Sequence, residues 1–451
     1  MTCQPSLTHE DRTTSRLPAT SERPTFYPGK EGSSATAAAP DRAMRHHAPM
    51  RILVASAPGV GHLLPLLPLA RAARERGHEV VIAGGASLEP IAAAAGFTLA
   101  AMGPATIDEV ARTIPGVREV SGRRRAVLIF RGAFCGVIAA DMADGIHELS
   151  SAWRPDVIVR EDMAFGAWIA ADREAIPHVT VQTTAWRPRM RDLAGEPLNE
   201  LRVRHGLAAD PELAGLLGRA FFTTRPPSLR DPALPFPAGT LELRPIADDR
   251  HAGAEADAGR AGGAGPAAGA GTDGDGPVDP FPPADGRPRV AVTLGTVNAG
   301  ETTVLRALID GAVAAGAHVV VALGADPATL GPVPAGVVVE AYVPMSTLLP
   351  AADLVAFHGG SGTMMAALAA ARPMVIVPLA ADQPDNADRC AAAGVARVVA
   401  IDELSVEGVR AAVEAVASDP TYRRRAAAVA AEIEAMPGPE VAVESLEALL
   451  R

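Results

Sequence analysis

The sequence predicts an α/β protein made of two doubly wound parallel sheets that face each other across a cleft. Three observations predict this fold. From Arg51 onward, short β-branched runs alternate with Ala-rich helical stretches, as in parallel sheets covered by helices. The alternation stops in a segment rich in Gly, Ala, Asp and Pro at 246–288 and restarts after it. A length of 451 residues is enough for two such domains, each with its own core.

Composition sets the expected domain boundaries. Residues 1–49 lack the apolar run of a signal peptide, so we expect a disordered N-terminal extension. The first domain is expected at 50–245. The segment 246–288 cannot bury enough apolar area to offset the entropy of ordering it, which predicts a flexible linker. The second domain is expected at 289–435, followed by a C-terminal helix at 436–451.

The first expected domain opens with a strand, a helix that Gly77 ends, and a second strand, which together form a βαβ unit. Because Met50 directly precedes the first strand, we expect natural translation to start at Met44 or Met50. The strands predicted in this domain are 52–56, 80–83, 156–159 and 179–182, and the helices are 63–76 and 165–171.

The second expected domain repeats the pattern. Its predicted strands are 290–294, 318–323, 337–342, 354–357 and 374–377, with a helix at about 303–315. Open parallel sheets bind ligands at the carboxyl ends of their strands. Candidate functional residues are therefore sought in the strand-to-helix turns.

Charge and cysteine content exclude several classes of function. The chain has 41 basic and 52 acidic side chains, a net charge of −11, which disfavours nucleic acid as a partner. Three scattered cysteines suit neither a disulfide framework nor a zinc site and indicate a reducing compartment, so we expect a cytoplasmic protein. The uncharged stretches 311–325 and 354–371 are diluted with Ala and Gly, so we expect no stable membrane insertion. The protein is expected to be a monomer or a homodimer.

The first strand-to-helix turn carries Gly59, Gly61 and His62. It is no dinucleotide fingerprint, because Leu64 occupies the third glycine position and no acidic residue follows the second strand. A histidine at a helix N-terminus beside the cleft is instead well placed as a general base, since its pKa lies near neutrality. The alternative is a histidine that only caps or packs.

A stronger pattern lies in the second domain, at residues 358–363. Glycines after a strand expose backbone N–H groups, the following helix contributes its positive end, and His358 and Thr363 add donors, which together predict a diphosphate-binding turn. The Gly-Lys-Ser/Thr of a nucleoside-triphosphate loop is missing, so phosphoryl transfer is not implied. The alternative is a purely structural turn.

Asp382 and Gln383 follow the next predicted strand. A carboxylate beside a carboxamide offers the acceptors and donors that a pair of adjacent hydroxyls needs. Alone, this pair is only a polar loop. Its place one βα unit after a diphosphate-binding turn is what makes a sugar ligand plausible.

A set of motifs over about residues 50–435 carries a family resemblance. The motifs are Gly61-His62, Thr293-Leu294-Gly295-Thr296, Tyr342-Val343-Pro344-Met345, Leu348-Leu349-Pro350, His358-Gly359-Gly360-Ser361-Gly362-Thr363, and Asp382-Gln383 with Asn386-Ala387. In these the chain resembles the family-one nucleotide-sugar glycosyltransferases of GT-B fold, and most of all the bacterial antibiotic and macrolide glycosyltransferases. The segment 246–288 is an unusual insertion for that family.

The resemblance implies roles for residues of the first domain. His62 would deprotonate the acceptor hydroxyl, oriented by an acidic residue after the fourth strand. Asp162 is the first candidate for that acid and Glu161 the second. The alternative for both acids is a solvated helix N-cap.

The resemblance also implies a donor site in the second domain, with residues for the diphosphate, the base and the sugar hydroxyls. These are Thr296, Tyr342, Val343, His358, Gly360, Ser361, Gly362, Thr363, Asp382 and Gln383. No metal and no resident cofactor is implied, because the nucleotide-diphosphate sugar is a co-substrate. Plant relatives carry a ribose-binding Glu where this chain has Ala366, so we favour a dTDP-sugar and keep a UDP-sugar open.

The function implied is inverting, metal-independent transfer of a sugar from a dTDP- or UDP-sugar to a hydroxyl of a small natural-product-like acceptor. The acceptor would lie against about residues 85–150 and 183–235, where the few aromatics suggest an aliphatic or adaptable pocket. Three alternatives stay open. They are a nucleotide-sugar epimerase, a lipid-intermediate glycosyltransferase using the Arg-rich residues 118–131 as a membrane-facing patch, and an accessory homologue without turnover.

Overall fold

The computed structural model describes residues 48–120, 122–185, 188–247, 279–295 and 301–451. The expected N-terminal extension at 1–49 lies outside these residues except for its last two, and so does most of the expected linker at 246–288. Both therefore stay predictions.

The first sheet has seven parallel strands in the order β3-β2-β1-β4-β5-β6-β7. The strands are β1 Arg51–Ala55, β2 Glu79–Gly84, β3 Thr98–Ala101, β4 Val157–Glu161, β5 His178–Gln182, β6 Ala220–Thr223 and β7 Leu241–Glu242. The strand order reverses between β1 and β4, and in a doubly wound sheet this switch point is where ligands bind. Strands β4 and β5 are buried along their whole length, as central strands of a covered sheet must be.

The second sheet has six parallel strands in the order β10-β9-β8-β11-β12-β13. The strands are β8 Arg289–Thr293, β9 His318–Ala322, β10 Val338–Glu340, β11 Leu354–Phe357, β12 Met374–Ile376 and β13 Ala396–Val398. Its order reverses between β8 and β11. The predicted α/β fold with two doubly wound parallel sheets is thus confirmed.

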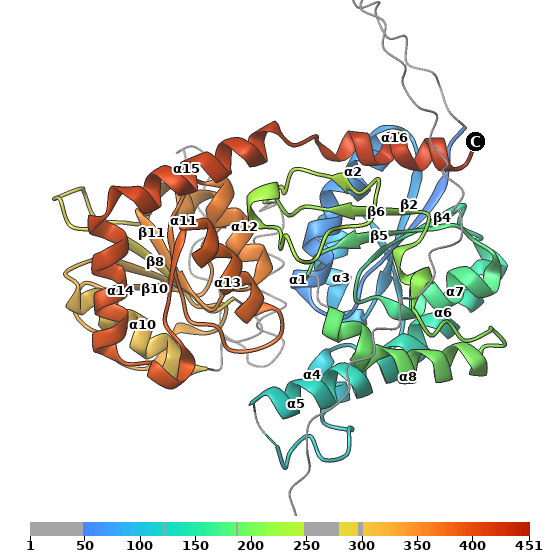
Figure 1. Cartoon of the computed structure of the whole chain (residues 1–451), viewed down its shortest axis with the longest axis horizontal. Coiled ribbons are helices and arrows are strands. Elements are labelled where there is room, and N and C mark those ends of the chain that lie inside the picture. The colour runs from blue at the N-terminus through green and yellow to red at the C-terminus, as the bar shows by residue number, and fades with distance from the viewer. Residues whose placement is uncertain (1–47, 121, 186–187, 248–278, 296–300) are drawn as a thin grey trace, which may run out of the picture. The chain divides into compact units, whose positions relative to one another are not determined.

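Helices cover both sheets (Figure 1). Those of the first part of the chain are α1 Val60–Leu63, α2 Leu67–Glu75, α3 Glu89–Ala94, α4 Ile107–Ala111, α5 Gly122–Ile129, α6 Ile138–Ala152, α7 Phe165–Glu174 and α8 Pro188–Arg204. Those of the second are α10 Thr302–Ala314, α11 Met345–Ala351, α12 Ser361–Ala369, α13 Gln383–Ala393, α14 Val406–Ser418, α15 Pro420–Ala435 and α16 Pro439–Leu449. The helix predicted at 63–76 is interrupted by the 3₁₀ turn Leu64–Leu66, which contains Pro65.

Helix α16 returns to the first sheet after the chain has completed the second. It lies beside α2 (Figure 1), and its Ala442, Val443 and Leu446 belong to the buried core of the first sheet. The buried Glu447 carboxylate accepts two hydrogen bonds from Arg76, at 3.0 and 2.9 Å. The last helix of the chain therefore completes the packing of the first sheet.

One helix in the described part of the chain, Arg124–Ala152, is long and apolar enough to cross a membrane by length and composition. It runs through α5, the π-helical segment Phe130–Val137 and α6. A third of its most apolar 18-residue stretch is buried inside the fold. Its α6 part packs tightly on α7, where a Cβ on Gly166 would stand 2.2 Å from the Ala139 carbonyl oxygen.

Candidate active site

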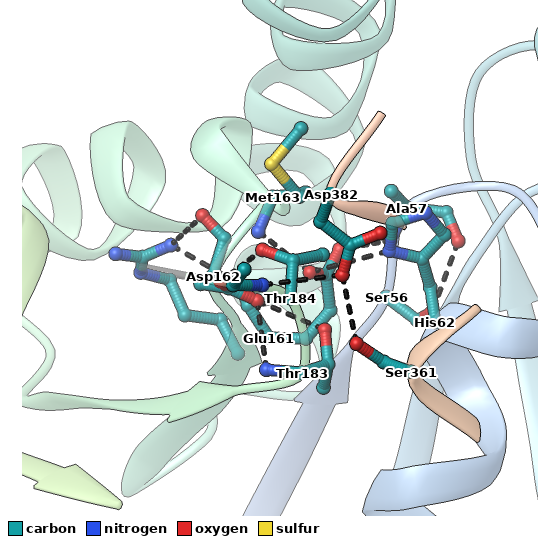
Figure 2. A network of polar contacts seen from close by, with 12 residues as sticks. Ser56, Ala57, His62, Glu161, Asp162, Met163, Thr183, Thr184, Ser361 and Asp382 are labelled. Carbon is teal, nitrogen blue, oxygen red and sulfur yellow. Dashed lines mark hydrogen bonds and ion pairs between the residues drawn. The ribbon is translucent and has the colours of Figure 1, made fainter. Parts of the chain in front are cut away.

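His62 lies in α1, directly after the turn that ends β1. Gly59 precedes that helix with a φ of +132°, a conformation that side-chain-bearing residues rarely adopt. The His62 side chain is 19% exposed and reaches the carboxyl end of β4, the strand next to β1 (Figure 2). The structure thus places His62 at the switch point of the first sheet.

Glu161, the last residue of β4, stands beside His62. One carboxylate oxygen, Oε2, lies 3.5 Å from His62 Nδ1 and also accepts the Met163 N–H at 2.6 Å. The other, Oε1, accepts the Ala57 N–H at 2.9 Å. The Glu161 side chain is fully buried, so these backbone donors hold its carboxylate in one orientation against His62.

This pairing shifts both pKa values toward an ion pair. Burial opposes protonation of His62, but the charge and hydrogen bond of Glu161, together with the charges of Asp162 and Asp382, outweigh it and raise the pKa of His62 above its ordinary 6.5. Burial disfavours the Glu161 anion, but His62 and the two backbone N–H groups outweigh it and lower the pKa of Glu161. The Glu161 carboxylate is therefore set to stabilise an imidazolium at position 62.

Asp162 has a different set of contacts. Its Oδ1 accepts hydrogen bonds from the Thr183 N–H at 3.0 Å and the Thr183 hydroxyl at 2.9 Å, and its Oδ2 accepts one from the Thr184 hydroxyl at 2.6 Å. It therefore ties the turn after β4 to the turn after β5. Glu161, and not Asp162, is therefore the acid that stands beside His62. The prediction that placed Asp162 first and Glu161 second is wrong.

The N-cap alternative for the two acids is wrong. The residue before α7 is Ala164, and it makes no side-chain capping bond.

Burial and the neighbouring Glu161 charge raise the pKa of Asp162, because the hydrogen bonds from the two threonines offset them only in part.

His358 follows β11 in the second sheet and is 7% exposed. Its ring lies between two glycines: a Cβ on Gly360 would stand 2.5 Å from His358 Nε2, and one on Gly295 would stand 3.3 Å from Cε1. Burial lowers the pKa of His358 to about 4, so its imidazole is neutral near pH 7. It can serve a ligand as a hydrogen-bond donor without carrying a charge.

The diphosphate-binding turn predicted at 358–363 coincides with the start of α12. Gly360 is the N-cap and makes no side-chain capping bond, and the first helical backbone bond runs from the Met364 N–H to the Gly360 oxygen. The N–H groups of Ser361, Gly362 and Thr363 therefore have no partner within the helix. Such an uncapped helix start is suited to binding an anion.

Asp382 and Gln383, expected to bind sugar hydroxyls, begin α13. Asp382 Oδ2 accepts the Ser361 hydroxyl at 2.7 Å (Figure 2). It also accepts the Asn386 amide at 3.2 Å and the Ala185 N–H at 3.2 Å, and none of these bonds uses Oδ1. Because Ala185 follows β5 of the first sheet, Asp382 connects the turns of the two sheets.

Gln383 is buried and uses its side-chain oxygen locally. That oxygen accepts the N–H groups of Leu379 and Ala380, at 2.8 and 2.9 Å. Its side-chain nitrogen is then the group that can donate to a ligand.

Two further donor-site candidates follow β10, an edge strand of the second sheet. Tyr342 is half-buried just beyond β10, and the Val343 side chain belongs to the core, which leaves only its backbone for a ligand. Thr296 falls outside the described residues. Within the described ranges, no group of three or more His, Cys, Asp or Glu side chains is arranged to hold a metal ion.

Sequence reasoning missed an aromatic group beside His62. The ring of Phe134 lies 5.7 Å from the ring of His62, and Phe130 contacts both Phe134 and Phe165. The wall near His62 is thus partly aromatic, although few aromatics in 85–150 had suggested an aliphatic pocket. The available signal was the four-residue spacing of Phe130 and Phe134, which places both on one face of a helix.

Two family models match the chain. The N-terminal domain of the erythromycin biosynthesis protein CIII-like family matches residues 71–192, and its C-terminal domain matches residues 306–449. The L-demethylnoviosyl transferase of Streptomyces niveus is 30% identical over 88% of this chain and 98% of its own length. The 4'-demethylrebeccamycin synthase of Lentzea aerocolonigenes is 30% identical over 89% of this chain and 99% of its own.

Solved structures agree with these matches. The glycosyltransferase SnogD from Streptomyces nogalater is 28% identical, with a TM-score of 0.65 over 90% of this chain and all of its own. The Streptomyces glycosyltransferase SsfS6, solved with thymidine diphosphate, is 26% identical, with a TM-score of 0.68 over 88% of this chain and 99% of its own. The chain belongs to the erythromycin biosynthesis protein CIII-like family, that is, to the family-one antibiotic glycosyltransferases of GT-B fold.

Proposed function

We propose that this nucleotide-sugar glycosyltransferase works by metal-independent inversion, with His62 as the base and a dTDP-sugar as the donor. Its family transfers sugars from nucleotide donors to natural-product acceptors. The observation that carries the mechanism is the His62–Glu161 pair, 3.5 Å apart at the switch point of the first sheet. The Asp382 charge also acts on His62, so a sugar held by Asp382 would lie near the base.

In this mechanism, His62 Nε2 takes the proton of the acceptor hydroxyl while the oxygen attacks the anomeric carbon. The bond from that carbon to the diphosphate oxygen breaks, and its electron pair leaves with the nucleotide diphosphate. Attack from the face opposite the leaving group inverts the anomeric configuration. Glu161 stabilises the imidazolium that forms, because its carboxylate stands on the Nδ1 side of the ring.

Charge develops on the leaving diphosphate as the bond breaks. The N–H groups of Ser361, Gly362 and Thr363, which have no partner within the helix, would donate to it at the positive end of the α12 dipole, and the neutral His358 would add a donor. These groups supply the stabilisation that a metal ion gives in other transferases, which is why we propose metal independence. EDTA should accordingly leave turnover unchanged.

We favour a thymidine diphosphate donor over a uridine one. Two of the similar structures, SsfS6 and the spinosyn rhamnosyltransferase SpnG, are described as complexes with thymidine diphosphate. In this chain the alanine at 366 offers no carboxylate to a ribose 2′-hydroxyl, so a nucleotide without that hydroxyl loses nothing there.

The test incubates the enzyme with dTDP-glucose or UDP-glucose, with and without a panel of polyketide and phenolic acceptors. We expect acceptor-dependent release of dTDP, with an inverted anomeric centre in the product by NMR. His62→Ala should abolish turnover and leave dTDP binding nearly unchanged. Unchanged turnover in that variant would remove His62 from the mechanism, and isomerised donor without acceptor would indicate an epimerase.

We also propose that the enzyme is located in the cytoplasm. The two described cysteines, Cys135 and Cys390, are buried free thiols, and burial raises the pKa of Cys390 to about 12. Such thiols stay protonated and unreactive. Fractionation of the native host should find the protein with the cytoplasmic enzymes.

A further inference from the structure

Arg225 is a buried cation that the mechanism above does not use. It follows β6 of the first sheet, and the residue is only 8% exposed. Its guanidinium donates from Nη2 to the side-chain oxygen of Asn386, 2.9 Å away in α13 of the second sheet. A buried arginine whose partner is a neutral carboxamide is unusual, because buried charges are ordinarily paired with opposite charges.

The position of Arg225 is set from the first sheet. Its own backbone N–H donates to the Thr223 hydroxyl oxygen at 3.1 Å. That hydroxyl in turn donates to the Gln182 side-chain oxygen at 2.7 Å, so the ends of β5 and β6 are joined here. All three residues are buried. These hydrogen bonds fix the backbone from which the Arg225 side chain extends.

This contact decides how the Asn386 amide is oriented. A guanidinium can only donate, so it must face the oxygen of the carboxamide and leave the NH₂ group pointing the other way. That NH₂ group has two hydrogens for three acceptors within reach, the Gly359 carbonyl at 2.9 Å, Ser361 Oγ at 3.0 Å and Asp382 Oδ2 at 3.2 Å, so the two longer contacts share one hydrogen. All three acceptors belong to the donor site.

The bond to the Gly359 carbonyl matters most for a diphosphate. The Gly359 carbonyl and the Gly360 N–H are parts of one planar peptide group, so holding one sets the direction of the other. Gly359 has a φ of +89°, where only glycine is at ease and where the backbone would otherwise have several orientations open to it. Asn386 removes that freedom.

We propose that Arg225 is a positioning residue for the nucleotide-sugar donor, although it lies in the part of the chain expected to bind the acceptor. Through the Asn386 amide it orders the turn from Gly359 to Ser361 and the Asp382 carboxylate. In this role it acts through Asn386 and not by contact with a substrate. The charges of Asp382 and Asp162 favour the guanidinium, while burial disfavours it and lowers its pKa. This inference rests on the donor site proposed above.

The test measures dTDP binding by isothermal titration calorimetry, and donor and acceptor KM, for Arg225→Met, Arg225→Lys, Asn386→Ala and the Met/Ala double variant. We expect Arg225→Met to weaken dTDP binding and raise the donor KM about tenfold, the equivalent of losing one charge-assisted hydrogen bond. The acceptor KM should stay within twofold. Arg225→Lys, which keeps a donor, should recover most of the loss.

The double variant separates positioning from general support of the fold. If Arg225 acts through Asn386, then Arg225→Met should add nothing to Asn386→Ala. Arg244→Met serves as the matched control, because Arg244 also joins the first part of the chain to the second, through Glu434 at 2.9 Å, but at an exposed site in α15. It should leave dTDP binding unchanged.

Two results would overturn the inference. One is wild-type dTDP affinity in Arg225→Met, and the other is an equal loss from Arg225→Met with and without Asn386. Both would leave the proposed glycosyl transfer intact, provided that the wild type binds dTDP. If the wild type binds neither dTDP nor UDP, the donor assignment fails, and the role of Arg225 fails with it.

Discussion

At the scale of single residues, the acid beside His62 is the feature that sequence reasoning ranked wrongly. Glu161 and Asp162 are adjacent, so either could follow the fourth strand. Successive residues at a strand end point in different directions, and only the folded geometry shows that Glu161 faces β1 while Asp162 faces the turn after β5. The histidine itself was predictable, because a Gly-rich turn after a first strand restricts where its side chain can lie.

Glu161→Gln tests this pairing. We expect a loss of about a hundredfold or more in kcat, because the amide cannot stabilise the imidazolium as the carboxylate does. In the wild type, kcat/KM should rise with pH through the His62 pKa, which lies above 6.5 because Glu161 raises it. Removing that charge should move the rise to lower pH. Asp162→Asn should move it less, and an unmoved profile in Glu161→Gln would mean that another group titrates.

The His358 ring lies so close to Gly360 that it leaves no room for a side chain at position 360. Its φ is ordinary for any residue, at −62°, so the cost of a side chain there is steric and not conformational. In Gly360→Ala the new Cβ would stand 2.5 Å from His358 Nε2 and displace the imidazole. We expect dTDP binding to weaken at least about tenfold with little loss of stability. Gly195→Ala in α8, where a Cβ meets nothing within 4 Å, should bind dTDP normally.

At the scale of elements, the sequence predicts the long buried strands at the centre of each sheet and misses four short strands nearer the sheet edges. Strands β1, β4, β5, β8 and β11 are buried runs rich in Val, Ile and Leu. Strands β3, β6, β7 and β13 were missed. They have two to four residues, and β3 is half Ala with no fully buried residue. Such segments become strands because a neighbouring strand offers its free edge, which a local pattern does not record.

The packing of α6 on α7 allows a sharp test at this scale. Ala is ordinarily better than Gly inside a helix by up to about 1 kcal/mol. At Gly166, however, a Cβ would stand 2.2 Å from the Ala139 carbonyl oxygen and 2.8 Å from Met142 Cβ, so the helices must separate. We expect Gly166→Ala to lower the free energy of unfolding by about 2 kcal/mol in urea titrations. A stabilised variant would show that the interface yields without cost.

At the scale of the whole molecule, two sheets could be predicted but the destination of the last helix could not. Helix α16 has an apolar face, and any exposed sheet face could receive it. The polar contacts that fix its place, from Arg76 and His78 to Glu447, join residues about 370 positions apart in the sequence. No local signal connects such residues, so this part of the architecture came only from the structure.

Glu447→Ala tests how much the contacts between α16 and the first sheet contribute to stability. It would remove a buried carboxylate that accepts two bonds from Arg76 and stands 3.2 Å from His78 Nε2. The Arg76 side chain is 34% exposed, so water can partly solvate it once its partner is gone. We therefore expect a loss of about 1–3 kcal/mol in the free energy of unfolding, from the missing charge-assisted hydrogen bonds. Glu444→Gln is the control, because Glu444 is 43% exposed and 3.9 Å from Arg76, and it should change stability by less than about 1 kcal/mol.

The return of α16 also means that the second sheet is, topologically, an insertion into the first. The chain leaves the first sheet near Arg244 and comes back near Pro437. These two chain segments are hydrogen-bonded to each other, since the Arg244 N–H donates to the Pro437 oxygen at 2.8 Å. A segment whose two ends meet can be exchanged without moving the ends of its host. Residues 245–436 therefore form a natural cassette, and grafting the matching segment of a relative with another sugar donor should change the sugar transferred while leaving the acceptor side of the protein as it is.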